Sequence, residues 1–242
     1  MKAVILSGGL GSRLGNLTKN CPKPLLKIKN LSIIEWQILC LKKAGVTEVL
    51  INLHYLGNQI QECLGNGTQF GIKIKYIYQD ILNGTAGGVK IFQNELIGEK
   101  YFFVLYGDIL INETLSDLIL HHHNNNADCS IYVHERKEFN SLLFFKKSNG
   151  MVLDFIERPN LKEKKCFINK YKINKYYSNS SIYLMNSNIL DYIPENKDTD
   201  FPKHIFSKII KNKKLYALQI KKQRYAIDTE ETYKLAQKFF KP

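Results

Sequence analysis

The chain lacks the cysteine pattern of a disulfide-bonded or zinc-binding protein. Its 242 residues include five cysteines, an odd number, and no two of them form a CxxC pair. A disulfide framework uses cysteines in pairs, and structural zinc sites use closely spaced ones, so neither is predicted. Unpaired cysteines suit a reducing compartment, and we expect a cytoplasmic protein.

Long apolar runs and linker-like segments are missing as well. No apolar stretch approaches the roughly 18 residues that a membrane span requires, and the first residues lack the pattern of a signal peptide. No segment rich in Pro, Gly or Ser divides the chain. We therefore expect residues 1–242 to form a single domain that is not bound to a membrane.

Acidic side chains are scarce relative to basic ones. The chain has 35 Lys and Arg against 22 Asp and Glu, a formal net charge of +13. This balance permits nucleic acid, an anionic membrane surface or phosphorylated small molecules as partners. Because no helix-turn-helix or RNP motif is recognisable, we expect no nucleic acid partner. A nucleic-acid-binding protein remains an alternative, which salt-dependent oligonucleotide affinity would test.

Apolar runs of strand length alternate with helical patterns in residues 1–125. The alternation is typical of βαβ units and predicts an α/β fold with a Rossmann-like, doubly wound, mostly parallel sheet. Such sheets bind ligands at the carboxyl ends of their strands, so the site is expected after Leu6 and Tyr106. The predicted strands are Lys2–Leu6, Glu48–Asn52, Ile72–Tyr78 and Tyr101–Tyr106, and the predicted helices are Ser32–Ala44, Gly57–Leu64, Thr85–Leu96 and Thr114–Asn125.

Residues 126–242 have a looser pattern, which predicts an antiparallel extension on the substrate side. A turn is expected at Asn149-Gly150. The segment Asn160–Tyr177 is rich in lysine and has no assignable structure. The predicted strands are Ser130–Val133, Leu142–Phe145, Val152–Ile156 and Ser181–Met185, and a helix is predicted over Glu230–Phe240.

A glycine-rich segment, SGGLGSRL at residues 7–14, directly follows the first predicted strand. Glycines there let the chain turn tightly and bring backbone N–H groups against an anion, and Arg13 adds a charge that suits phosphate oxygens. A tight surface turn is the alternative. The spacing is neither that of the dinucleotide fingerprint nor that of a P-loop.

Lys23 lies between Pro22 and Pro24 shortly after the glycine-rich segment. The two prolines stiffen the backbone on both sides of the lysine, which helps to place its point charge between phosphates. Residues 7–28 resemble the GGxGxRLxxLTxxxPKPLLxI signature of the sugar-nucleotide pyrophosphorylases, the nucleotidyltransferases that make nucleotide sugars. Further segments that resemble the family's motifs are NGTAGG at 83–88, YGD at 106–108, FIERP at 155–159, NSSIY at 179–183 and AIDT at 226–229.

The resemblance implies transfer of a nucleoside monophosphate from an NTP to a phosphorylated small molecule, with a sugar 1-phosphate as the leading acceptor and pyrophosphate as the product. Residues 1–125 would form the nucleotide-binding half and residues 126–242 the acceptor-binding half, and a homo-oligomer is possible. Because two polyanions must meet, metal and basic side chains have to neutralise their repulsion. The implied roles are catalysis by Arg13 and Lys23, nucleotide binding by Leu6, Gly8, Gly9, Gly11, Ser12, Gln79, Gly84 and Thr85, acceptor binding by Glu157, Arg158 and Asn179, and Mg²⁺ binding by Asp108 and Asp228.

Simpler explanations exist for some of these residues. Asp108 could start a turn or cap a helix, Asp228 could cap the final helix, and Asn179 could be a turn residue. Arg158 replaces the family's lysine, and Ser180-Ser181 replace its Ala-Gly, so the acceptor stays open: phosphocholine or a phosphorylated amino acid are alternatives to a sugar 1-phosphate. An inactive nucleotide-binding regulator is disfavoured, because it would normally have lost Lys23 or Asp108.

Gln79 leads to a prediction about the nucleotide. The family places this position on the loop that faces the base, and relatives that use GTP commonly have a glutamate there. An amide offers one donor and one acceptor, which suits a pyrimidine, so CTP is predicted slightly ahead of dTTP or UTP. The alternative is that Gln79 ends its strand and faces solvent.

Overall fold

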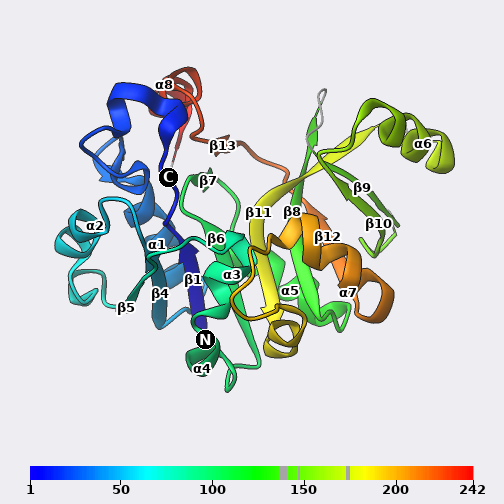
Figure 1. Cartoon of the computed structure of the whole chain (residues 1–242), viewed down its shortest axis with the longest axis horizontal. Helices are drawn as coiled ribbons and strands as arrows, with labels where there is room; N and C mark the ends of the chain where they lie inside the picture. The colour runs from blue at the N-terminus through cyan, green and yellow to red at the C-terminus, as the bar shows by residue number, and fades with distance from the viewer. Residues whose placement is uncertain (137–140, 147, 173–174, 242) are drawn as a thin grey trace.

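A seven-stranded sheet forms the centre of the computed structural model, which describes residues 1–136, 141–146, 148–172 and 175–241 (Figure 1). Its strand order is β12-β8-β11-β6-β1-β4-β5. Neighbours among β6, β1, β4 and β5 pair in parallel, as do β12 and β8, whereas β11 is antiparallel to β6 and β8. The predicted α/β fold with a mostly parallel sheet is confirmed. The strands are β1 (Lys2–Leu6), β4 (Glu48–Leu53), β5 (Lys73–Tyr78), β6 (Tyr101–Tyr106), β8 (Cys129–Arg136), β11 (Tyr176–Asn186) and β12 (Leu215–Gln219).

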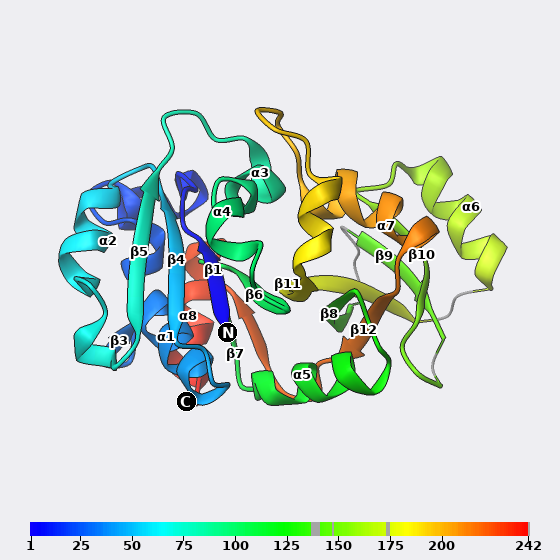
Figure 2. The ribbon, with the colours of Figure 1, turned by 90° about the horizontal axis from the view of Figure 1, so that it is seen from below.

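Helices cover both faces of the sheet, because successive strand residues point to opposite sides and both sides are apolar (Figure 2). Val4 and Val104 are buried with α3 (Gly84–Lys90), α4 (Gln93–Leu96) and α7 (Phe206–Asn212). Ala3 and Ile5 are buried with α1 (Ile33–Lys43), α2 (Gly57–Leu64) and α5 (Leu115–Asn124).

Three small two-stranded sheets complete the fold. One of them, β9 (Ser141–Phe145) with β10 (Val152–Glu157), is the antiparallel pair predicted around Asn149-Gly150. The strand predicted at Ser130–Val133 is part of β8, which lies in the central sheet, antiparallel to β11 and parallel to β12, and not beside the β9–β10 pair. The other two sheets are β2 (Lys27–Ile28) with β3 (Leu31–Ser32), and β7 (Ile109–Ile111) with β13 (Arg224–Ala226).

Two helical predictions also need correction. The expected helix Thr85–Leu96 is divided into α3 and α4, and the chain bends between them where Phe92 is fully buried. The unassigned lysine-rich segment contains α6 (Leu161–Tyr171), which begins with a capping box between Asn160 and Glu163. The final helix is α8 (Glu230–Phe239), as predicted.

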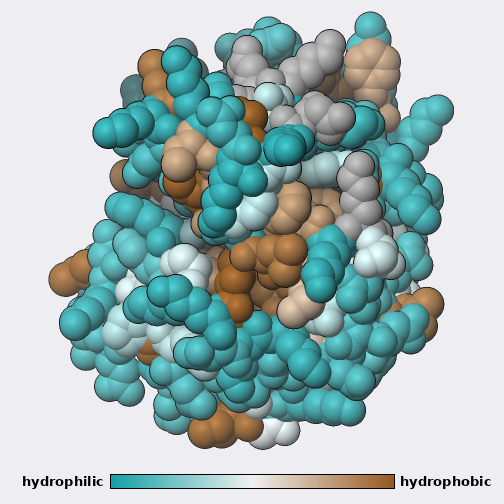
Figure 3. Space-filling model, turned by 90° about the vertical axis from the view of Figure 1, so that its right-hand side faces the viewer, coloured by the Kyte–Doolittle hydropathy of each residue, from teal (hydrophilic) through white to brown (hydrophobic). Residues whose placement is uncertain are grey.

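The outer face that carries α6 is mostly hydrophilic, with apolar residues gathered in a hollow at its centre (Figure 3). Within the described residues, the chain forms no helix that is both long and apolar enough to cross a membrane.

Candidate functional site

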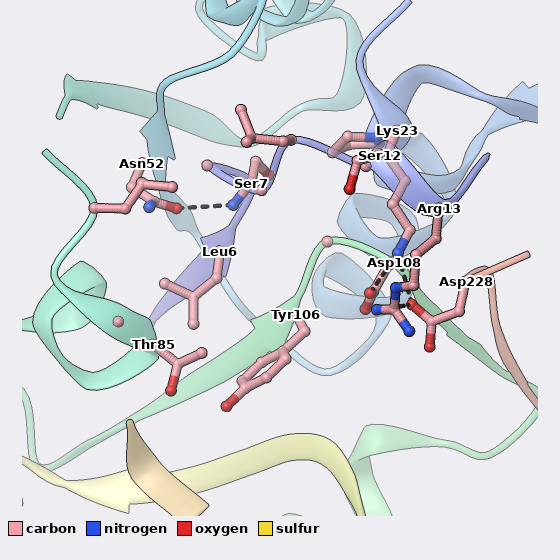
Figure 4. A pocket seen from close by; sticks show the side chains of 18 of the residues that line it. Leu6, Ser7, Ser12, Arg13, Lys23, Asn52, Thr85, Tyr106, Asp108 and Asp228 are labelled. Atoms are coloured by element: carbon pink, nitrogen blue, oxygen red, sulfur yellow. Dashed lines mark hydrogen bonds and ion pairs between the residues drawn. The ribbon is translucent and has the colours of Figure 1, made fainter. Parts of the chain in front are cut away.

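The glycine-rich segment follows β1 at the carboxyl end of the sheet and lines a cleft of about 430 Å³ (Figure 4). The Ser7 amide donates to Oδ1 of Asn52 over 2.8 Å, which fixes the first turn of the loop. Gly11 has a left-handed backbone with φ of 66°, which side chains rarely adopt, and a side chain there would also come within 3.3 Å of Cβ of Lys23. The loop therefore needs glycine for its shape.

Most residues predicted to bind the nucleotide lie in this cleft. Thr85 donates from its amide and its hydroxyl to Oδ1 of Asp200, each over 3.0 Å, which holds the start of α3 against the cleft. The predicted residues that line the cleft are Leu6, Gly8, Gly9, Gly11, Ser12, Arg13, Lys23, Gly84, Thr85, Asp108 and Asp228.

Gln79 does not lie as predicted. It is 7% exposed, so it does not face solvent, and it is absent from the residues that line the cleft. Its Oε1 accepts a 2.7 Å hydrogen bond from Nδ2 of Asn52, the residue that holds the Ser7 amide. Gln79 thus supports the glycine-rich loop through Asn52, and one acceptor position of the amide that was expected to suit the base is occupied.

Lys23 is held between two carboxylates. It begins a short 3₁₀ turn, Lys23–Leu25, and its side chain is 11% exposed. Its Nζ lies 2.7 Å from Oδ2 of Asp108 and 3.0 Å from Oδ1 of Asp228. Figure 4 shows this cluster at one end of the cleft, with Arg13 beside it.

The pairing of β7 with β13 brings Asp108 and Asp228 together. Asp108 lies in the turn between β6 and β7, and the amide of Ile227 donates to its carbonyl over 2.9 Å. Asp228 directly follows Ile227 in the chain, so this hydrogen bond holds it close to Asp108. The residue that caps α8 is Thr229, so the carboxylate of Asp228 is left facing the cleft.

The electrostatics of this end of the cleft are dominated by ion pairs. Burial alone would raise the pKa of Asp228, but Lys23 and Arg13 outweigh it and hold the pKa below its usual value. Arg13, whose side chain is largely exposed, donates to Oδ1 of Asp228 over 2.9 Å. Oδ1 of Asp108 is buried and has no hydrogen-bond partner in the described part of the chain.

These two carboxylates fit a hard divalent cation. Mg²⁺ is typically held by one or two carboxylates together with phosphate oxygens and water, and the free oxygen of Asp108 offers such a ligand. Among the described residues, no group of three or more His, Cys, Asp or Glu side chains could hold a metal by itself. A metal here would therefore depend on oxygens from a substrate.

A second cleft, of about 300 Å³, contains the predicted acceptor-binding residues Glu157, Arg158 and Asn179. Burial, opposed by Arg158 and aided by Asp200, raises the pKa of Glu157 to about 7. The amide of Asn179 donates to the Tyr183 hydroxyl over 2.7 Å, and its oxygen accepts from Ser181 over 2.9 Å. Asn179 thus lines the cleft and also stabilises a bulge in β11.

Several residues of the two clefts were missed at the sequence level. Asn52 ends a predicted strand, and a polar residue at the carboxyl end of a parallel strand is a signal that could have placed it in the site. Arg224 lies four residues before Asp228, so strand alternation could have placed both on one face. Asp200 had no signal, because it enters the site from a distant, irregular segment.

A family model described as nucleotidyl transferase matches residues 2–231. The chain belongs to this family. It is 33% identical over 223 residues to the mannose-1-phosphate guanylyltransferase catalytic subunit beta of Dictyostelium discoideum, covering 91% of this chain and 59% of that protein. It is 35% identical over 224 residues to a probable mannose-1-phosphate guanylyltransferase 3 of Oryza sativa subsp. japonica, covering 90% and 58%. The chain thus spans about three fifths of the length of these relatives.

Solved structures share the fold of the whole chain. A putative glucose-1-phosphate thymidylyltransferase from Bacillus anthracis superposes with a TM-score of 0.82 at 22% identity, covering 100% of this chain and 97% of that one. HddC from Yersinia pseudotuberculosis superposes with a TM-score of 0.78 at 22% identity, covering 99% of both chains. A further structure of HddC, in complex with GMP-PN, has a TM-score of 0.77 at 22% identity and the same coverage. At this identity the likeness shows the fold.

Proposed function

We propose that this protein transfers a nucleoside monophosphate from an NTP to a sugar 1-phosphate and releases pyrophosphate. One observation carries the proposal: the glycine-loop cleft and the second cleft meet, and Arg13, Asp108 and Asp228 line both. A triphosphate in the first cleft and a phosphorylated acceptor in the second would meet at these charged side chains.

The residues of the site suit an in-line displacement. An oxygen of the acceptor phosphate attacks the α-phosphorus, a new P–O bond forms, and the bond to the leaving pyrophosphate breaks. The loop amides and Arg13 would hold the triphosphate, and Lys23 would neutralise charge on the reacting phosphates. Lys23 is already held at this end of the cleft by Asp108 and Asp228. No covalent enzyme intermediate is needed.

Asp108 and Asp228 would bind Mg²⁺ together with phosphate oxygens. The cation would neutralise the charge that develops between the two phosphate groups. The buried, unpartnered oxygen of Asp108 supports this assignment, since a buried carboxylate oxygen without a partner is costly.

GTP is the nucleotide that we propose first. The curated relatives at 33% and 35% identity are named as guanylyltransferases, and one solved structure of the same fold is a complex with GMP-PN. The pyrimidine prediction depended on contact between Gln79 and the base, and that side chain instead accepts from Asn52 outside the lining of the cleft. CTP therefore becomes the alternative.

A pyrophosphate-release screen tests the proposal. Each NTP is combined with mannose 1-phosphate, other sugar 1-phosphates and phosphocholine, and GTP with a sugar 1-phosphate is expected to give the fastest release. Turnover with CTP and phosphocholine alone would contradict the assignment. Nucleotide binding without release from any pair would instead identify a regulator.

A further inference from the structure

We propose that Arg224 and Arg136 form the subsite that binds the phosphate group of the acceptor, an inference that rests on the proposed function. Neither residue belongs to the motifs that identify the family in this sequence. Both line the second cleft, into which Asp108 and Asp228 also project.

Strand alternation places Arg224 on the side of the reacting groups. It is the first residue of β13, which pairs with β7 just beyond Asp108. Arg224, Ala226 and Asp228 line the second cleft, whereas Tyr225 and Ile227 between them are buried in a small apolar core. An acceptor phosphate on Arg224 would therefore lie on the same face of the strand as Asp228.

The attraction of Asp108 and Asp228 only partly offsets the cost of burying Arg224. The Nε of Arg224 makes one long hydrogen bond, 3.4 Å, to the carbonyl of Ser180. In the part of the chain that the structure describes, neither Arg224 nor Arg136 forms an ion pair with a carboxylate. The nearby carboxylate of Asp228 is already paired with Lys23 and Arg13.

Burial makes the charge of Arg224 costly. Desolvation, opposed by Asp108 and aided by Arg136, lowers the pKa of Arg224 to about 10. A multiply charged anion would stabilise the partly buried Arg224 and relieve its repulsion with the exposed Arg136, and the planar donors of both side chains match phosphate oxygens. His134 adds a third polar group: its Nδ1 contacts the Ser180 hydroxyl at 2.9 Å, and its buried Nε2 has no partner among the described residues.

Arg158, which the family resemblance assigns to the acceptor, is placed differently. Its side chain is 86% exposed, and its nearest carboxylate is Glu157 at 3.8 Å. An exposed arginine at the rim can attract an anion but contributes little to holding it, because water screens its charge. We therefore assign the tight phosphate contact to Arg224, and attracting roles to the exposed Arg136 and Arg158.

A comparison of four variants tests the subsite. Arg224→Met removes the charge and keeps an unbranched side chain, Arg224→Lys keeps the charge, and Arg136→Met removes the second guanidinium. Lys222→Met is the matched control, because this exposed lysine is close in sequence but lines neither cleft of the site. Steady-state pyrophosphate release gives KM for the acceptor and for the nucleotide separately.

Arg224→Met is expected to raise the acceptor KM by about tenfold or more, with the nucleotide KM changed by less than about threefold. Arg224→Lys should recover part of this loss, and Arg136→Met should raise the acceptor KM by a smaller factor. A merely structural role would affect both KM values alike and would not be rescued by lysine. An acceptor KM in Arg224→Met equal to that of Lys222→Met would overturn the proposal.

A second measurement does not depend on catalysis. Inorganic phosphate is expected to raise the Tm of the wild-type protein, and the rise should fall to roughly half or less in Arg224→Met, with the remainder due to the glycine-rich loop. An equal rise in Arg224→Met and Lys222→Met would refute the subsite, even if no acceptor were turned over and the proposed function had failed. If Arg224→Met does not fold, the same two measurements, the acceptor KM and the rise of Tm with phosphate, are made on Arg136→Met. Values equal to those of Lys222→Met would then refute the subsite.

Discussion

The ammonium group of Lys23 lies 2.7 Å from Oδ2 of Asp108, although 85 residues separate them in the chain. The contact joins the stiff segment after the glycine-rich loop to the end of the buried strand β6. In the proposed reaction the same two groups would serve a phosphate and a metal. Their pairing keeps both charges neutralised until substrates arrive.

Lys23→Met should reduce kcat by at least about 100-fold, because it removes a charge that stabilises the transferring phosphates. The variant should fold, since Lys23 lies at the edge of the cleft rather than in an apolar core. Pyrophosphate release and circular dichroism measure the two properties. Lys19→Met, an exposed lysine in the same segment, is the control and should keep near-normal turnover. Equal activities of the two variants would mean that Lys23 has no part in the chemistry.

The sequence was sufficient to predict the sheet and the roles of the glycine-rich segment and Lys23 because both depend on local patterns. Buried strand runs, the glycine-rich segment and the two prolines beside Lys23 each have a direct structural cause. Asp108 and Asp228 were predicted separately from their motifs. Their contact with one lysine follows from the pairing of β7 with β13, which only the folded chain shows.

The errors also have physical causes. Gln79 was expected to face the base or solvent, and its contact with Asn52 was not foreseen because the partner of an amide depends on tertiary neighbours. The helix α6 was missed because its lysines obscured an apolar pattern, although Asn160 and Glu163 have the spacing of a capping box. Arg224 was overlooked because a single arginine has no meaning in sequence until its strand is placed.

Excess EDTA should abolish pyrophosphate release, and added Mg²⁺ should restore it, because the two carboxylates are themselves anions and need a bound cation to act on the phosphates. Asp108→Asn should weaken the apparent affinity of the protein for Mg²⁺ and reduce kcat by at least about 100-fold. Mn²⁺ binding followed by water-proton relaxation provides a direct readout in the presence of nucleotide. Full turnover in EDTA would rule out the metal role of Asp108 and Asp228.

Gln79→Glu should leave the order of nucleotide preference unchanged. The glutamate can still accept the hydrogen bond from Asn52 Nδ2, and its position lies outside the lining of the nucleotide cleft. Titration calorimetry of each NTP with wild-type and variant protein measures the preference. Gln79→Ala, which removes the support of Asn52, should weaken binding of every NTP by a similar factor. A switch of preference toward GTP in Gln79→Glu alone would instead indicate that residue 79 contacts the base.

Glu157→Gln should change how stability depends on pH. Burial, partly offset by Arg158 and reinforced by Asp200, raises the pKa of Glu157 to about 7 from its ordinary value of 4.5. The folded protein therefore binds a proton here that the unfolded chain has released between these two pH values, so stability falls as pH rises through about 7. Glutamine cannot ionise and escapes this loss.

The Tm of Glu157→Gln minus that of the wild type should accordingly increase from pH 5 to about pH 8 and then level off. Each kcal/mol of differential stability corresponds to roughly 2–4 °C for a chain of this size, so the effect is measurable by scanning calorimetry. Glu163→Gln is the control, because Glu163 makes the same substitution possible at an exposed position, in the capping box of α6, outside the second cleft. If the wild-type and Glu157→Gln curves ran parallel across this range, Glu157 would be ionised throughout, and its carboxylate would be available to the acceptor as a permanent negative charge.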